Sequence, residues 1–147
     1  MKVNRQRCWI CEYFSDVHRK EQPLWIADLQ VSTALIETNQ ICRGYTDLIY
    51  NKGHKTELFQ LSKKEQIAFM EDLVKVAKAI NNAFHPVKMN YELLGNTVPH
   101  LHWHIIPRKK SDPIELHWPI WGKDYHKVNL SDNEYRKIVS RIRKYLL

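Results

Sequence analysis

The feature that most constrains this chain is residues 100–106, HLHWHII, where histidine alternates with apolar residues. Successive side chains of a β-strand point to opposite faces. The run therefore predicts a strand with three imidazoles on one face and core side chains on the other. A row of surface histidines on an edge strand is the plain alternative, but such strict alternation of one residue type is hard to obtain from solubility alone.

The spacing of the three histidines restricts what they can do together. At ~3.3 Å per residue the outer two α-carbons stand ~13 Å apart, whereas zinc holds its nitrogen ligands at about 2 Å. Two of the three could share an ion, but one ion does not suit all three. A neutral imidazole can instead attack phosphorus while its neighbours donate hydrogen bonds to the phosphate oxygens. The spacing favours this division of labour, with one nucleophile between two supporting groups.

The rest of the pattern predicts an α+β fold, an antiparallel sheet of about five strands with helices packed on it. Short apolar, partly β-branched runs at 24–28, 32–37 and 45–50 predict strands, as do 89–94 and 100–107. Capping boxes at 62–65 and 131–134 predict the starts of a long central helix, running to about residue 84, and of a C-terminal helix. Apolar residues follow at helical spacing; they are Ile67, Met70, Leu73, Val74, Ala77 and Ile80 in the first helix, and Tyr135, Ile138, Val139, Ile142 and Leu146 in the second.

Length and composition favour a single domain in the cytoplasm. The chain has 147 residues, no composition break, no apolar stretch long enough to span a membrane and no secretory signal. Its net charge of +7 would attract anions such as nucleotides or nucleic acids. A solvated cationic surface with no such partner would give the same net charge. An odd number of cysteines argues against a disulfide framework, and Cys8 and Cys11 form a C-x-x-C pair that suits zinc, a thiol redox pair or two buried cysteines.

The run at 100–106 resembles the His-φ-His-φ-His-φ-φ signature of the histidine triad (HIT) superfamily of nucleotidyl hydrolases and transferases, where φ is apolar. The segment 51–54, NKGH, resembles the family's Pro-Lys-x-His segment, with Asn51 in place of the proline. The downstream stretches 107–108, 112–113 and 118–122 resemble a bacterial branch labelled diadenosine tetraphosphate hydrolase-like. The resemblance implies a single HIT-like domain over 1–147, with its core at about 8–110 and a C-terminal extension at 111–147.

Carried over by position, the resemblance makes His102 the nucleophile that attacks an α-phosphorus and forms a nucleotidyl-histidine intermediate. His104 would then hydrogen-bond the α-phosphate, and His100 would support the orientation of the nucleophile. Asn96 and Thr97 stand where members have a glutamine and a serine near the scissile phosphate, and the shorter Asn96 places the leaving-group contact in question. These roles imply no catalytic cofactor.

His54 matches a fourth family histidine beside the triad, which makes it a candidate for the phosphate site. In some bacterial members the N-terminal cysteine pair and two histidines hold zinc, which here would give a structural site of Cys8, Cys11, His54 and His100. Two buried cysteines beside two catalytic-shell histidines are the alternative. Trp118 and Trp121 could cover a nucleobase, and Arg108 could meet a phosphate or lie exposed at the strand end.

The resemblance thus implies a nucleotide hydrolase, a homodimer, acting on adenosine phosphoramidates or dinucleoside polyphosphates. Two other classes stay open on the sequence. One is a protein that binds nucleic acid or removes adenylate from its ends, which the net charge would suit, although no zinc finger, Gly-rich RNA motif or long basic helix supports it. The other is a zinc-stabilised interaction module with vestigial activity. The sequence indicates no membrane partner.

Overall fold

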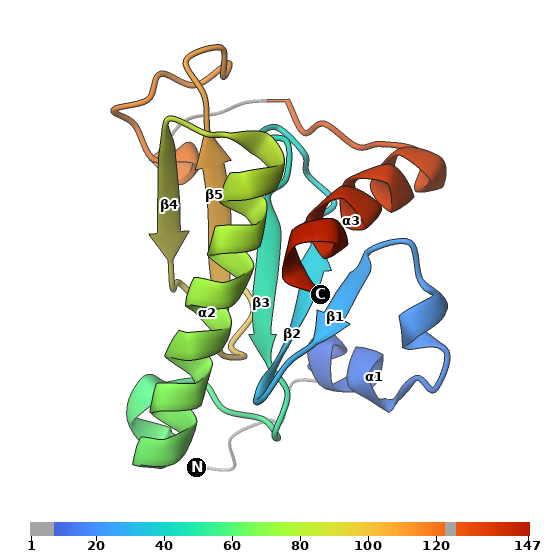
Figure 1. Ribbon diagram of the computed structural model, residues 1–147. Helices are drawn as coiled ribbons and strands as arrows, with labels where there is room; N and C mark the ends of the chain where they lie inside the picture. The colour runs from blue at the N-terminus through green and yellow to red at the C-terminus, as the bar shows by residue number, and fades with distance from the viewer. Residues whose placement is uncertain (1–7, 123–125) are drawn as a thin grey trace.

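Five strands form one antiparallel sheet within the part of the chain that the structure describes, residues 8–122 and 126–147. In this computed structural model the strands lie in the order β1-β2-β3-β5-β4 (Figure 1). Their bounds are β1 (Trp25–Asp28), β2 (Ser32–Ile36), β3 (Thr46–Tyr50), β4 (Lys88–Glu92) and β5 (His102–Arg108). The predicted α+β class is confirmed, and β5, the histidine strand, lies inside the sheet between β3 and β4.

Two helices begin where the capping boxes predicted. Helix α2 (Lys63–Phe84) starts after Ser62 and helix α3 (Asp132–Leu146) after Ser131, and each serine side chain accepts a hydrogen bond from the backbone three residues on. Helix α2 ends at Phe84, and the cap residue His85 adopts a left-handed conformation with φ +48° immediately before Pro86. Both helices cover the same face of the sheet (Figure 1).

The main core lies between this face and the two helices. All the predicted apolar positions of α3 are buried. In α2, the prediction holds for Leu73, Ala77 and Ile80, but Ile67, Met70 and Val74 are 54%, 50% and 58% exposed. The predicted apolar set is wider than one helix face, and the sheet and α3 cover only part of it. An apolar stripe of α2 therefore faces away from the core.

The opposite face of the sheet carries helix α1 (Trp9–Ser15), which the sequence analysis did not predict. Ile10 of α1 packs against Leu35 of β2 and Ile49 of β3, side chains that alternate with those of the main core. The short 3₁₀ turns are η1 (Arg19–Glu21), η2 (Leu58–Gln60) and η3 (Ile120–Gly122). None of the described helices has the length and apolar content needed to cross a membrane.

Arg108, at the end of β5, is fully buried, so neither of the roles considered for it holds. Its guanidinium forms an ion pair with Asp112 and donates to Asn90 and to the backbone carbonyls of Ile114 and Trp118. A guanidinium has five N–H donors and needs several acceptors when it is buried. Arg108 therefore organises the segment that follows β5 and leads to η3.

Candidate functional site

Only two of the three histidines in the predicted row lie on strand β5. His102 and His104 belong to the strand, opposite Ile49 and Asp47 of β3, but His100 precedes it. Trp103 and Ile105, between and after the strand histidines, pack into the main core as alternation predicted. The imidazoles of His102 and His104 lie on the α1 side of the sheet, whereas the His100 ring turns toward the N-terminal cysteines.

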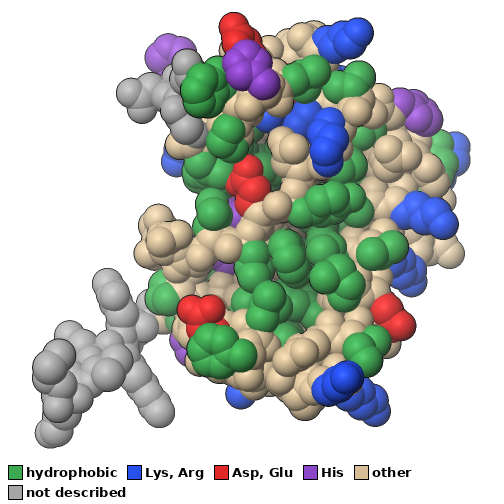
Figure 2. Space-filling model, turned by 90° about the vertical axis from the view of Figure 1, so that its left-hand side faces the viewer, with side chains coloured by type: hydrophobic (Ala, Val, Ile, Leu, Met, Phe, Trp, Pro, Cys, Tyr) green, Lys and Arg blue, Asp and Glu red, His purple; other side chains and the backbone are tan. Residues whose placement is uncertain are grey.

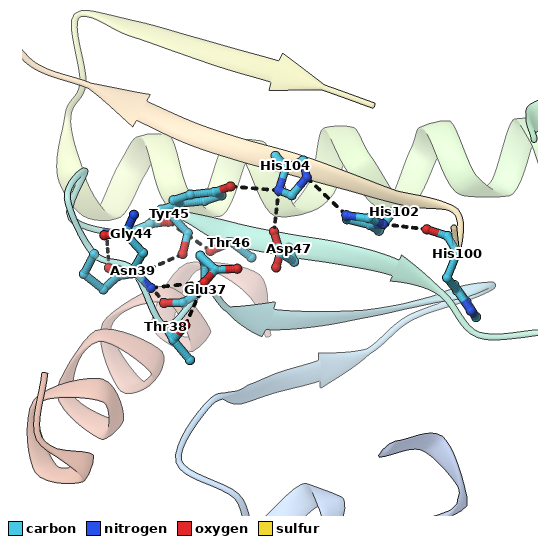
Figure 3. A network of polar contacts seen from close by, with 11 residues as sticks. Glu37, Thr38, Asn39, Gly44, Tyr45, Thr46, Asp47, His100, His102 and His104 are labelled. Atoms are coloured by element: carbon cyan, nitrogen blue, oxygen red, sulfur yellow. Dashed lines mark hydrogen bonds and ion pairs between the residues drawn. The ribbon is translucent and has the colours of Figure 1, made fainter. Parts of the chain in front are cut away.

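A chain of close polar contacts links the three histidines, as Figure 3 shows. The Nδ1 of His102 lies 2.5 Å from the backbone carbonyl of His100, which can only accept, so this nitrogen carries the hydrogen. His102 Nε2 lies 3.1 Å from His104 Nε2. The Nδ1 of His104 in turn meets Asp47 Oδ1 at 2.9 Å and the Tyr45 hydroxyl at 2.8 Å. Each strand imidazole is thus held at Nδ1 and presents Nε2 to the space in front of the sheet.

Burial determines the charge state of these rings. It lowers the pKa of His102 below its ordinary value near 6.5, against the hydrogen bond to the His100 carbonyl. Burial also lowers the pKa of His104, against the negative charges of Glu37 and Glu92. At neutral pH His102 is therefore unprotonated at Nε2, with a lone pair available for attack.

The two strand histidines open into a pocket of about 410 Å³. Asn96 and Thr97, exposed in the loop between β4 and β5, contribute to its wall, so the structure brings them together with His102 and His104. The other lining residues are Trp9, Ile10, Glu37, Asp47, Ile49, Leu94, Gly95, Val98 and Trp121. The ring of Trp121 lies 5.2 Å from that of His104, and Trp118 lines a different cavity, outside β4.

His54 and His100 are absent from this lining and meet instead in a second cluster with Cys8 and Cys11. The four potential ligand atoms lie within 4.8 Å of one another. Cys8 Sγ is 3.5 Å from His100 Nδ1, and Cys11 Sγ is 3.4 Å from His54 Nδ1 and 3.6 Å from His100 Nδ1. His54 thus lies at the candidate metal cluster and does not line this pocket.

The geometry of this cluster fits a tetrahedral metal. Zinc bound to sulfur at about 2.3 Å and to nitrogen at about 2.0–2.1 Å separates those two atoms by about 3.5 Å, which matches the observed distances. Burial and the neighbouring Cys8 raise the pKa of Cys11 to about 11, so the free thiol is a poor nucleophile. The Nε2 of His100 lies 2.8 Å from the Tyr50 carbonyl, the kind of outer hydrogen bond that orients a metal-binding histidine.

The acidic side of the pocket was not predicted from the sequence. Glu37 follows β2, and Asp47 interrupts the apolar run of β3; their carboxyls are hydrogen-bonded to each other. A carboxylate on an otherwise apolar strand is a signal that sequence inspection could have used, because such a residue is seldom buried without a partner. The contribution of Trp9 depends on α1, which had no recognisable start signal.

Comparison with known proteins agrees with this geometry. The model of the family described as HIT domain matches residues 22–111 of the chain. The chain belongs to the HIT domain family. Among curated HIT proteins, it is 29% identical over 105 residues to Protein hit of Bacillus subtilis (strain 168), which covers 67% of this chain and 72% of that protein.

Solved HIT structures share the fold over almost the whole chain. A histidine triad protein from Bradyrhizobium japonicum superposes with a TM-score of 0.77 at 26% identity, covering 90% of this chain and 96% of that one. A Zn-bound histidine triad family protein from Mycobacterium smegmatis has a TM-score of 0.65 at 20% identity, covering 95% and 92%.

Proposed function

We propose that this HIT protein is a nucleotidyl hydrolase in which His102 attacks the α-phosphorus of a bound nucleotide. The observation that supports this most is the pair of hydrogen bonds that hold Nδ1 of His102 and of His104 and leave both Nε2 atoms facing the pocket. His102 Nε2 would form a bond to phosphorus as the leaving group departs, and water would then cleave the nucleotidyl-histidine. His104, Asn96 and Thr97 would donate to the phosphate oxygens.

The charge of the pocket favours one substrate class over another. Among the described residues, its lining includes the Glu37 carboxylate, to which the Asp47 carboxyl is hydrogen-bonded, but no lysine or arginine. A polyphosphate chain would meet negative charge there without a compensating cation. We therefore favour nucleoside phosphoramidates over dinucleoside polyphosphates, and an adenine base against the apolar wall that Trp9, Ile10 and Val98 contribute.

A substrate panel tests this proposal. Adenosine phosphoramidate, diadenosine tetraphosphate and 5′-adenylated DNA are incubated with the protein, AMP release is followed, and the protein is searched by mass spectrometry for a mass increase of one AMP. We expect the phosphoramidate to give the highest kcat/KM and the adduct to map to His102. A preference for adenylated DNA by ~100-fold or more, about 2.7 kcal/mol of transition-state discrimination, would instead support the nucleic-acid alternative.

Two further proposals concern what the chain binds besides substrate. Cys8, Cys11, His54 and His100 would hold one structural zinc, which would supply cross-links between α1 and the segments before α2 and β5. A second copy of the chain would cover the face that contains the exposed stripe of α2. Figure 2 shows hydrophobic side chains gathered on this face, where the free edge of β4 also lies. An exposed hydrophobic patch of this kind is typical of a protein–protein interface.

A further inference from the structure

The contact that holds Nδ1 of His104 also determines where this ring carries its hydrogens. Asp47 lies directly opposite His104 in the register of β3 and β5, and its Oδ1 is 2.9 Å from His104 Nδ1. Only 14% of the Asp47 side chain and 10% of the His104 side chain is exposed, so water has little access to the contact. The positions of the hydrogens are therefore fixed by the partners that the protein supplies.

The proton of the acidic pair belongs to Asp47. Ionised carboxylates only accept hydrogen bonds, so the bond between Asp47 and Glu37 requires a proton on one of them. Glu37 also accepts from the Thr38 hydroxyl at 2.8 Å and from the Asn39 backbone N–H at 3.1 Å. Although burial opposes the effect, these bonds lower the pKa of Glu37, while burial and the charge of Glu37 raise that of Asp47 well above its usual range. Glu37 is thus the carboxylate and Asp47 the carboxylic acid.

This assignment fixes the direction of the bond to His104. Because the Asp47 hydroxyl donates to Glu37, Asp47 Oδ1 can only accept, and His104 Nδ1 must carry a hydrogen. The Tyr45 hydroxyl oxygen, 2.8 Å from the same nitrogen, shares that hydrogen in a three-centre bond. The nitrogen at which His104 gains and loses a proton is therefore Nε2, which faces His102 and the pocket (Figure 3).

We propose that Asp47 is a positioning residue for protonation of the leaving group; this inference rests on the proposed function and extends it. By accepting the Nδ1 hydrogen, Asp47 makes Nε2 the acidic position of the protonated His104. As the His102 Nε2 lone pair forms the N–P bond, the bond from phosphorus to the leaving group breaks with its electron pair, and the Nε2 proton of His104 moves to the leaving atom. His104 ends neutral, with its Nδ1 hydrogen still donated to Asp47.

The surroundings of His104 make the protonated state accessible during turnover. Three acidic side chains face it, Asp47 from β3, Glu37 from the end of β2 and Glu92 from β4, together with Tyr45 and His102. The charges of Glu37 and Glu92 favour the imidazolium against its burial, and an anionic substrate phosphate would add to them. An amine leaving group, which departs poorly as an anion, would depend on this proton.

The test compares two variants and two leaving groups. Asp47→Asn keeps a carbonyl for His104 and supplies an N–H for Glu37, in the same places as the carboxylic acid, whereas Asp47→Leu removes both. The substrates are an adenosine phosphoramidate with an alkylamine leaving group and the p-nitrophenyl ester of AMP, whose leaving group needs no proton. For Asp47→Leu we expect kcat to fall ~10²-fold or more with the amine substrate but less than about fivefold with the ester. For Asp47→Asn the ratio of the two rates stays within about threefold of the wild-type ratio.

Other outcomes would contradict either the inference or the proposed function. Equal losses on both substrates in Asp47→Leu would mean that Asp47 is merely structural and would overturn the inference. A selective loss of the amine reaction in Asp47→Asn would overturn it too, because it would show that an ionised carboxylate is required; this variant can therefore refute the inference even if Asp47→Leu does not fold. If wild-type protein released no AMP from either substrate, the proposed function itself would fail. AMP affinity by calorimetry and thermal unfolding serve as controls for each variant.

Discussion

At the scale of single residues, the two strand histidines have different chemical duties although they sit two positions apart. Removing an attacking group abolishes the covalent path, whereas removing one hydrogen-bond donor to the transition state costs about 10²–10³ in kcat. We therefore expect His102→Ala to lose more than about 10³-fold in kcat and to yield no adduct, and His104→Ala to be the milder change. Steady-state kinetics with the phosphoramidate measures both. Retention of a tenth of wild-type kcat by His102→Ala would refute the covalent assignment.

The same two residues should make stability sensitive to acid. Their pKa values are lowered in the folded protein, chiefly by burial, so between those values and about 6.5 the unfolded chain binds more protons than the folded one. The free energy of unfolding should thus be level above pH 6.5 and decline as the pH falls below it. Thermal unfolding at pH 7.5, 6.5 and 5.5 measures this decline, which should be smaller in a His102→Gln/His104→Gln double variant. An identical pH dependence in the two proteins would contradict the prediction.

At the scale of elements, the Cys/His cluster should determine how strongly α1 is held against the rest of the fold. Helix α1 has only seven residues and no side-chain cap, so its stability must come from tertiary contacts. We expect purified wild-type protein to contain about one zinc per chain and Cys11→Ser to lose the metal and unfold at lower temperature, because metal bound only to the folded state stabilises it. Cys42→Ser is the matched control, since Cys42 lies in a separate apolar cluster. Elemental analysis showing no zinc in wild-type protein prepared without chelator would end the proposal.

The secondary-structure elements differ in how well the sequence predicts them. Both capping boxes and all five strands were predictable, because their signals are local hydrogen bonds and alternation over a few residues. The start of β5 was misplaced by two residues because His100 obeys the alternation pattern yet belongs to the cysteine cluster. The inward position of Arg108 and the Asp47–Glu37 pair depend on partners far along the chain or across strands, which a residue pattern does not contain.

At the scale of the whole molecule, the exposed stripe of α2 should govern assembly. Ile67, Met70 and Val74 lie at helical spacing on one side of α2 and are about half exposed. We expect wild-type protein to elute with twice the mass of one chain in size exclusion with light scattering, and Met70→Glu to shift it toward the mass of a single chain, because a buried unpaired charge is costly. Val17→Glu, at an exposed apolar residue outside the stripe, should leave the mass unchanged. A monomeric wild-type protein would exclude this interface.

His100 contributes to two neighbouring structures through different atoms. Its side chain belongs to the Cys/His cluster, while the nucleophile depends on its backbone carbonyl. Every amino acid has a backbone carbonyl. The side chain at position 100 can therefore change without removal of the carbonyl that orients His102. A substitution at position 100 can thus remove one side chain from the Cys/His cluster and still keep the carbonyl to which His102 donates.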